Sequence, residues 1–489
     1  MQSGKCKVQS VGRQRGSILV ATLVFSFIFV VIAGSLLGFV SQQRRVSRQR
    51  QTQMTALQIA EAGANFYRWH LAHAPTDYAD GTGQTGCSPC GPYTRNYTDP
   101  SGSVLGQFSL EITPPQLGST IVRVKATGWN ADYPQLERQV VVRYGRPSLA
   151  RYAILSNADI RFGSGTTVQG PLHSNGGIRF DGVANNVISS SRQTYDDPDS
   201  DACTFTSWGV HTCVTPADPA PPTQPPSRLD IFAAGRSYPV PTVDFNALTI
   251  NLSELKTAAI ASGIHLNPSN QQGRHIQFLG NTTFRHRKVR TTRTCTWGNP
   301  PQTSPVGDIY EYIGNWATEN LPANGIIFVE DNAWVDGTAA AGSKITLVAA
   351  KEPLASGNAT IWINNDLLYA DASGTTTVGL IAQRDVSVGL FSEDVLDINA
   401  ALVAQTGRVG RPYYPSGCSS TYYKRSTITV YGAIASNQRY GFAWGCGGVY
   451  CSGYNTRNLF FDSHLTYGPP PSFPTAGEYE FISWEEVNP

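Results

Sequence analysis

The residues with the clearest chemical potential in this 489-residue chain are its nine cysteines. Cys6 lies in a basic N-terminal segment, and the other eight are Cys87, Cys90, Cys203, Cys213, Cys295, Cys418, Cys446 and Cys451. Four disulfides from these eight would suit an oxidising compartment. Short spacing makes Cys203/Cys213 and Cys446/Cys451 plausible local pairs, and Cys295 with Cys418 would tie an insertion to the main β-region.

The spacing of Cys87-Ser-Pro-Cys90 allows three kinds of site. A thiol redox centre needs a βαβ setting, which this segment lacks. Half of a zinc site needs a second Cys-x-x-Cys, and the chain has none. A disulfide is the favoured interpretation.

Two charged segments are candidate binding sites. Asp197, Asp199 and Asp201 alternate in a short loop, and such oxygen ligands suit Ca²⁺, although the EF-hand Gly and Glu are missing. A solvated acidic loop is the alternative, and no other cofactor is expected. The basic segment offers contacts to DNA, an acidic glycan or a membrane surface, or it forms one solvated strand face; its cations are Arg285, Arg287, Lys288, Arg290 and Arg293. The Tyr-rich stretch 413–431 is a further contact candidate.

Two catalytic motifs match by residue type and spacing but lack the sequence context that they need. Gly81 to Gly86 matches G-x-G-x-x-G without a preceding strand, and Ser253-Glu-Leu-Lys256 matches S-x-x-K without a Lys-Thr-Gly. No G-x-S-x-G or P-loop occurs, so the chain is not expected to be an enzyme. Carboxylates that could serve a carbohydrate-active site show no common register in the sequence; they are Asp366, Asp385, Glu393, Asp394 and Asp397.

The composition indicates an exported, β-rich protein. Only 15% of residues are charged, whereas 47 are Gly, 31 are Pro and 22 are Tyr. Helical bundles need more Ala, Leu, Glu and Lys, and disordered chains carry fewer apolar residues than the 40% found here. A net charge of +2 excludes general nucleic-acid binding by bulk electrostatics.

The N-terminus predicts a membrane helix. Residues 1–16 carry Lys5, Lys7, Arg13 and Arg15 and no acid, and residues 17–40 carry no charge. That apolar run is long enough to span a bilayer and too long for a secretory signal. Helical periodicity continues beyond it, and no Pro occurs before Pro75, which predicts one helix over 17–75.

This N-terminus resembles that of type IV pilins and related prepilins. The resemblance rests on Arg15-Gly16-Ser17, which matches the prepilin cut site, and on the segment 56–65, which is similar to minor pilins with a PilX-like N-terminus. It implies cleavage between Gly16 and Ser17 by a prepilin peptidase, N-methylation of Ser17, and contacts with other pilins or minor pilins through the helix. Most major pilins carry Glu at the fifth mature position, where this chain has Ala21, so a minor or priming subunit fits better. A plain signal anchor is the alternative.

The fold class expected is α+β: a long N-terminal pilin-type helix, a small antiparallel β head, and a large parallel β-helix (solenoid) ectodomain. We expect a leader over 1–16, the head over 76–147, the solenoid over 148–195 and 321–467, an insertion with a Pro-rich linker over 196–320, and a C-terminal cap over 468–489. Apolar strands spaced 16 to 18 residues apart from Ile327 onward, and the echo of Ile160-Arg-Phe at Ile178-Arg-Phe, predict the solenoid.

These features predict a structural, minor pilin-like subunit of a type IV pilus or secretion pseudopilus. It would sit in the inner membrane as a single-pass protein and then at the cell surface or on an extracellular pilus, for tip assembly or adhesion. A surface glycan or DNA is the candidate ligand. The alternatives are a membrane-anchored carbohydrate-active β-helix protein and a surface adhesin without pilus machinery.

Overall fold

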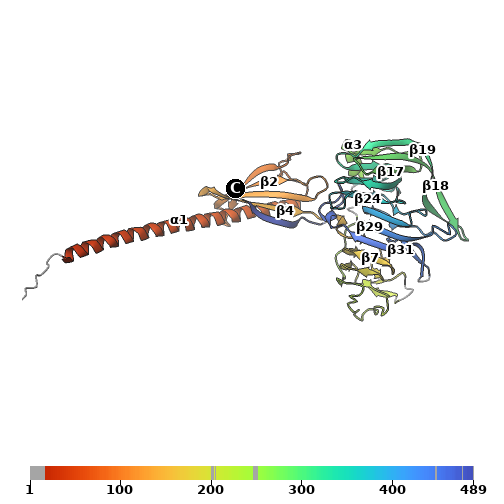
Figure 1. Ribbon diagram of the computed structural model, residues 1–489, viewed down its shortest axis with the longest axis horizontal. Helices are drawn as coiled ribbons and strands as arrows, with labels where there is room; N and C mark the ends of the chain where they lie inside the picture. The colour runs from red at the N-terminus through yellow and green to blue at the C-terminus, as the bar shows by residue number, and fades with distance from the viewer. Residues whose placement is uncertain are drawn as a thin grey trace, which may run out of the picture. The chain divides into compact units, whose positions relative to one another are not determined.

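The computed structural model describes residues 17–199, 203, 205–245, 252–446, 449–475 and 477–487. It is β-rich with one long N-terminal helix (Figure 1). Two compact units are described separately: the helix with the β head, and the ectodomain, which holds residues 113–123 and 143–482. The predicted leader, with Gly16, and the ligand candidate Asp201 lie outside the described residues.

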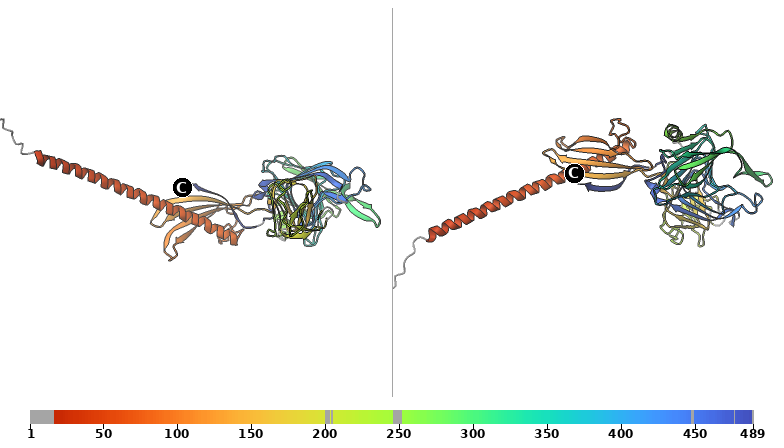
Figure 2. Two further views of the ribbon diagram at one scale, coloured as in Figure 1. Left: turned by 90° about the horizontal axis from the view of Figure 1, so that it is seen from below. Right: turned by 45° about the horizontal axis from the view of Figure 1, so that its top comes forward.

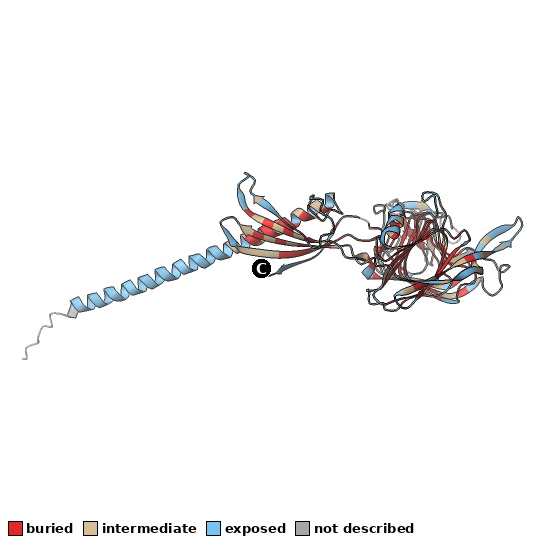
Figure 3. Ribbon diagram, turned by 90° about the horizontal axis from the view of Figure 1, so that it is seen from above, coloured by how far each residue is buried: buried red, intermediate tan, exposed pale blue. Residues whose placement is uncertain are grey.

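Helix α1 runs from Ser17 to His73 without interruption. Its apolar first half is bare: Ile18 is 81% exposed and Phe25 71% exposed, as the pale-blue ribbon of Figure 3 shows. Among the described residues it is the one helix long and apolar enough to cross a membrane. Arg44, Arg45 and Arg48 follow at the end of that half, where they would meet the polar interface.

The second half of α1 is buried against the head, and small residues make this possible. Ala56, Ile59 and Ala60 are fully buried. A β-carbon added at Gly63 would lie 2.7 Å from the ring of Phe108 on the sheet. The segment 56–65, which carries the pilin resemblance, is therefore the helix face that contacts the head.

The head is a five-stranded sheet in the order β1-β2-β3-β4-β32. Its strands are β1 Cys90–Thr98, β2 Val104–Thr113, β3 Ile121–Asn130, β4 Tyr133–Gly145 and β32 Glu480–Val487. In β2 every second side chain is buried, including Phe108, Leu110 and Ile112, as expected of a sheet with one covered face.

The predicted cap over 468–489 holds only for its start, which packs on the ectodomain: Oγ1 of Thr346 donates to the carbonyl of Pro471 at 2.5 Å, and Phe473 is buried. Its end is no cap, because β32 joins the head sheet beside β4, where Arg138 and Glu486 form an ion pair. A strand at that edge pairs the backbone groups that β4 would otherwise leave open.

The described part of the ectodomain contains a 22-stranded sheet in which most pairings are parallel. It also contains a three-stranded sheet of β14 Val210–His211, β9 Ile178–Phe180 and β6 Ile160–Phe162, and a two-stranded sheet of β12 Thr194–Asp196 and β13 Thr206–Trp208. Five strands of the later sequence follow one another in the 22-stranded sheet: β20 Ile326–Val329, β22 Lys344–Ala349, β25 Thr377–Ala382, β27 Val395–Ala404 and β29 Lys424–Ser436. On another face lie β21 Ala333–Ala339, β23 Ile361–Trp362, β24 Leu367–Tyr369, β26 Val386–Ser387 and β28 Val409–Gly410.

The strands over 154–190 are called the earlier run, and those over 326–461 the later run. The earlier run stacks onto the end of the later run. β5 Ile154–Ser156 pairs in parallel with β29, and β7 Thr166–Gln169 pairs in parallel with β31 Val449–Phe461. In Figures 1 and 2 the blue strands accordingly lie between the teal strands and the yellow ones. The chain thus enters the stack in its middle.

The sequence echo of the earlier run is a pair of stacked strands. β6 Ile160–Phe162 and β9 Ile178–Phe180 pair in parallel with Ile160 opposite Ile178 and Phe162 opposite Phe180. Further strands extend this end: β8 Leu172–Ser174, β10 Val183–Ala184, β11 Ile188–Ser190, β12 Thr194–Asp196, β13 Thr206–Trp208, β14 Val210–His211 and β15 Arg236–Ser237.

The spacing of 16 to 18 residues between apolar strands after Ile327 is not the spacing between strands that pair. Ile345 pairs with Val378 and not with Ile361, which pairs with Ala333 and Val386. Apolar strands 16 to 18 residues apart therefore lie on different faces, because the strands that pair are farther apart in the sequence.

The predicted insertion 196–320 is also too long. β16 Ile264–Leu266 and β17 Gly273–Leu279 already pair in parallel with β20 and β21. Helix α3 Leu252–Ser262 precedes them and buries Leu252, Leu255 and Ala259. What projects from the parallel stack is the antiparallel hairpin of β18 Thr283–Trp297 and β19 Gln302–Asn320.

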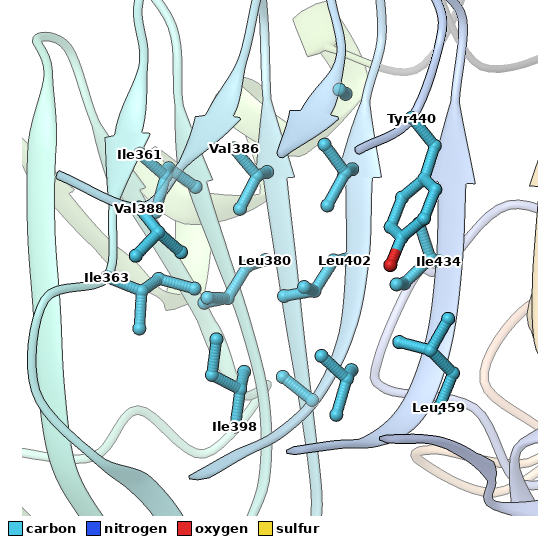
Figure 4. Packing of buried hydrophobic residues seen from close by; sticks show 14 of the residues in the cluster. Ile361, Ile363, Leu380, Val386, Val388, Ile398, Leu402, Ile434, Tyr440 and Leu459 are labelled. Carbon is cyan, nitrogen blue, oxygen red and sulfur yellow. The ribbon is translucent and has the colours of Figure 1, made fainter. Parts of the chain in front are cut away.

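Inward side chains from successive strands form one apolar core. Figure 4 shows Leu380, Leu402 and Ile434 in a row, and all three are buried. The remaining elements are β30 Ala443–Cys446 and the short 3₁₀ turns Leu149–Arg151 and Ser463–Thr466.

Close approach of α1 to β3 gives a testable prediction for the head. A β-carbon at Gly128 would lie 2.4 Å from the backbone nitrogen of Ala60 and 2.5 Å from the carbonyl oxygen of Ala56. Because backbone must move, Gly128→Ala should lower the free energy of unfolding by about 1–3 kcal/mol, measured by thermal unfolding in detergent. Gly38→Ala, in the bare half of α1 where nothing lies within 4 Å, is the control and should not destabilise the protein. Equal unfolding temperatures for both variants would contradict this packing.

Candidate functional sites

The structure joins the eight mature cysteines as Cys87–Cys90, Cys203–Cys213, Cys295–Cys418 and Cys446–Cys451. These are the pairs that the sequence analysis named. The Cys295–Cys418 bridge links residues 123 positions apart and ties the β18–β19 hairpin to the Tyr-rich segment. By the loop-closure argument such a long link is the most stabilising of the four.

The calcium candidates lie among cations. Asp197 is 1% exposed, with an Nη atom of Arg179 at 3.7 Å and Nε2 of His211 at 3.3 Å from its Oδ2. Burial raises the pKa of Asp197, but hydrogen bonds from the His211 ring and the backbone of Asp199, with the nearby charge of Arg179, together outweigh this and the net pKa is lowered. Asp199 forms an ion pair with Arg439. A Ca²⁺ ion would have to compete with these arginines for the two carboxylates that the structure describes.

A second metal-type group includes the same aspartate. One donor atom each of Asp197, Cys203, His211 and Cys213 lies within 4.8 Å of the others. Zinc would suit two thiolates, an imidazole and a carboxylate. The disulfide between Cys203 and Cys213 removes both thiolates, and His211 with Asp197 alone is too small a ligand set.

The basic strand β18 is held against β19 by its own cations. Arg285 lies 4.4 Å from the ring centre of Trp316, Arg287 lies 4.8 Å from that of Tyr312, and Arg293 lies 4.5 Å from that of Tyr310. Arg290 pairs with Glu311 at 2.9 Å. Four of the five predicted binding cations thus have partners inside the hairpin, and Lys288 lies opposite Ile313 of β19 and Arg274 of β17.

The Tyr-rich segment 413–431 is largely structural. Tyr414 is fully buried, and its hydroxyl donates to the carbonyl of Pro305 at 2.8 Å. Tyr422 is covered by the guanidinium of Arg425 at 4.3 Å.

The ectodomain contains an acidic row that the sequence did not disclose. Gly337 pairs with Leu367, and Leu367 pairs with Ile398, so the residues before them stand side by side on three strands: Asp336, Asp366 and Asp397. Neighbouring strands lie about 4.8 Å apart, which places these carboxylates in one line. The backbone N–H of Asp397 donates to Oδ1 of Asp366 at 2.9 Å.

His275 extends this row toward the hairpin. Its Nε2 lies 2.8 Å from Oδ2 of Asp336, and its Nδ1 lies 2.8 Å from the hydroxyl of Tyr312. A carboxylate only accepts hydrogen bonds, so Nε2 carries a proton, and Nδ1 and the Tyr312 hydroxyl share the second hydrogen bond. Burial raises the pKa of Asp336, but its interactions with His275, Asn365 and Gln277 together outweigh this and the net pKa is lowered. Asp336 is therefore held as the anion.

Glu393 lies next to the row, and its pKa is shifted in the opposite direction. Partial burial of its carboxyl and the neighbouring carboxylate of Asp366 raise the pKa of Glu393. Carboxyl groups whose pKa values are pushed apart are typical of sites for general acid–base chemistry. Asp385 lies elsewhere and contacts Arg384, while Asp394 pairs with Arg425.

Sequence reasoning found three members of this group, Asp366, Glu393 and Asp397, but not Asp336, His275 or their register. Asp336 follows the buried strand Trp334-Val335 as an isolated acid, and His275 lies in the segment assigned to the insertion. The one usable signal was that Asp366 and Asp397 each directly precede a buried apolar residue of a strand.

Comparison with known proteins gives little beyond the layout. No protein-family model matches the chain, and no curated protein sequence matches it. Among solved structures, the crystal structure of the competence-associated pilin ComZ from Thermus thermophilus is similar, with 14% sequence identity and a TM-score of 0.29. The alignment covers 89% of this chain and 98% of that chain. At that TM-score the similarity carries no argument; the layout of one long N-terminal helix followed by β-sheet is compatible with a pilin-like protein.

Proposed function

We propose that this chain is a minor pilin-like subunit of a type IV pilus or a related secretion pseudopilus. It would be inserted in the inner membrane by the first half of α1 and would present the ectodomain, as a β-solenoid, for tip assembly or adhesion. This role is structural and requires no catalysis. Its partners would be other pilins, contacted through the helix, and the prepilin peptidase.

The observation that carries the proposal is the division of α1. Its apolar half is bare over 18–40, whereas Ala56, Ile59, Ala60 and Ala64 in its second half are buried against the head. A bare apolar surface of this length needs lipid or other apolar helices around it, and a pilin helix meets both in turn. Ala21, where a buried carboxylate would be costly unless paired, favours a subunit outside the bulk of the shaft.

The first prediction concerns processing. In protein isolated from its own membrane, the N-terminal peptide should begin at N-methylated Ser17, as measured by intact mass and peptide mass spectrometry. Gly16→Val should keep the leader in place, because the peptidase cuts after this small residue. Gly12→Val, a matched change within the same leader, should still be cut. If the wild-type chain begins at Met1, the protein is a plain signal anchor or a surface adhesin outside the pilus machinery.

A membrane-anchored carbohydrate-active protein is the second candidate, and one observation favours it. Asp336, Asp366 and Asp397 lie in register with Glu393 beside them, and pKa values of Asp336 and Glu393 shift in opposite directions. Two carboxyl groups in different protonation states flank the bond in most glycoside hydrolases.

This candidate predicts release of reducing ends from polyuronide or neutral glycan chains by the purified full-length protein. Glu393→Gln should lower that rate by about a hundredfold or more, because the proton donor is lost. Glu311→Gln, an exposed partner of Arg290 on the hairpin, is the matched control and should leave the rate unchanged. No release by the wild type, or equal rates in both variants, would exclude hydrolysis at this row.

A further inference from the structure

The ectodomain has a hollow of about 540 Å³ between strands of its earlier and later runs. Five arginines line it: Arg161, Arg179, Arg408, Arg439 and Arg457. Of the described residues that line it, Asp181 and Asp199 are the carboxylates and none is a lysine, so they carry a formal excess of three positive charges. Its volume lies in the range of small-ligand pockets, about 300–1,000 Å³.

Both carboxylates are already used by arginines of the wall. Nε of Arg179 lies 2.9 Å from Oδ2 of Asp181, and Arg439 forms an ion pair with Asp199. The described lining keeps its formal excess of three positive charges when both pairs are counted.

Buried Arg457 and half-buried Arg408 are neutralised only by backbone and hydroxyl dipoles and by ring contacts among the described residues. Arg457 is 7% exposed and donates to Oγ1 of Thr166 at 3.0 Å and to the carbonyls of Tyr454 and Asn455 at 2.8 and 2.6 Å. Arg408 donates to the carbonyl of Arg411 at 2.6 Å and lies over the ring of Trp444 at 5.0 Å. No ion pair joins either guanidinium to a carboxylate in the part of the chain that the structure describes.

Burial of a cation without a counter-ion costs free energy, and this cost lowers the pKa of both guanidinium groups. Burial lowers the pKa of Arg408, with only partial compensation from the charge of Asp385, and it lowers the pKa of Arg457. Proteins that keep such charges usually pair them. An anionic ligand in the hollow would supply the missing charge.

The wall also contains a surface for a ring. Trp444 and Tyr450 line the hollow and are half-buried. Aromatic side chains offer a flat apolar surface, and ligand pockets combine such surfaces with a few polar groups that fix orientation.

We propose that this pocket binds a sugar unit that carries a carboxylate, with Arg408 and Arg439 facing the carboxylate and Trp444 beside the ring. Guanidinium groups suit carboxylates because they can donate two parallel hydrogen bonds. The cations are gathered in one bounded hollow, whereas nucleic-acid binding relies on a track of many phosphate contacts. The inference rests on the surface exposure of the proposed function, but binding does not require pilin processing, so the two can fail separately.

The test is calorimetric titration of the full-length protein in detergent micelles with digalacturonic acid and with its uncharged dimethyl ester. The acid should bind at least about tenfold more tightly than the ester, and its affinity should fall as salt is added. Arg408→Gln and Arg439→Gln should each weaken binding of the acid by about tenfold or more. The Arg439 side chain is 39% exposed, so this second variant keeps the test valid if Arg408→Gln does not fold.

Arg290→Gln, an exposed arginine on the β18–β19 hairpin, is the matched control and should bind the acid like the wild type. The proposal is overturned if the wild type does not bind the acid, if the ester binds equally well, or if Arg439→Gln leaves the affinity unchanged. It is also overturned in favour of nucleic acid if a single-stranded DNA oligonucleotide displaces the acid and Arg439→Gln abolishes the binding of that DNA.

Discussion

The parallel pairing that joins the two runs of the ectodomain is the interaction on which the rest of it depends. Ile154 lies opposite Ile434, and Val168 lies opposite Leu459, so residues almost three hundred positions apart share one core. Neither run could cover its own end: the earlier run is a few short strands of two to four residues, and the later one would expose the edges of β29 and β31. Closure buries both ends and makes one continuous apolar interior.

Both candidate sites follow from this stacking of parallel strands. The arginine-lined hollow takes Arg161 and Arg179 from the earlier run and Arg408, Arg439 and Arg457 from the later one, so it exists only when the runs are joined. The acidic row depends on the same geometry in another way. Parallel pairing places equivalent outward positions in line, which aligns Asp336, Asp366 and Asp397 although 30 and 31 residues separate them in the sequence.

Local patterns predicted the parts whose physics is local. The uncharged run 17–40 and the absence of Pro before Pro75 predicted a helix that the structure ends at His73, and alternation predicted β2 to β4. The position of each strand in the sheet could not be predicted, because the pairing of parallel strands depends on packing between residues far apart in the sequence. For that reason β32 was taken for a cap, β16 and β17 for an insertion, and 16- to 18-residue spacings for coils. For the same reason, the sequence did not predict the register of Asp336 or the excess of positive charge around Arg408.

The central claim is that the ectodomain is one cooperative stack closed by β5 and β7. Hydrogen exchange of the full-length protein in detergent, followed by mass spectrometry, tests it most directly. The account predicts that amides of Ile154 and Val168 exchange as slowly as those of Leu380 and Leu402, since all four need the same core to open. Exchange of the earlier run more than about a hundredfold faster than the later one would show two independent units and contradict the account.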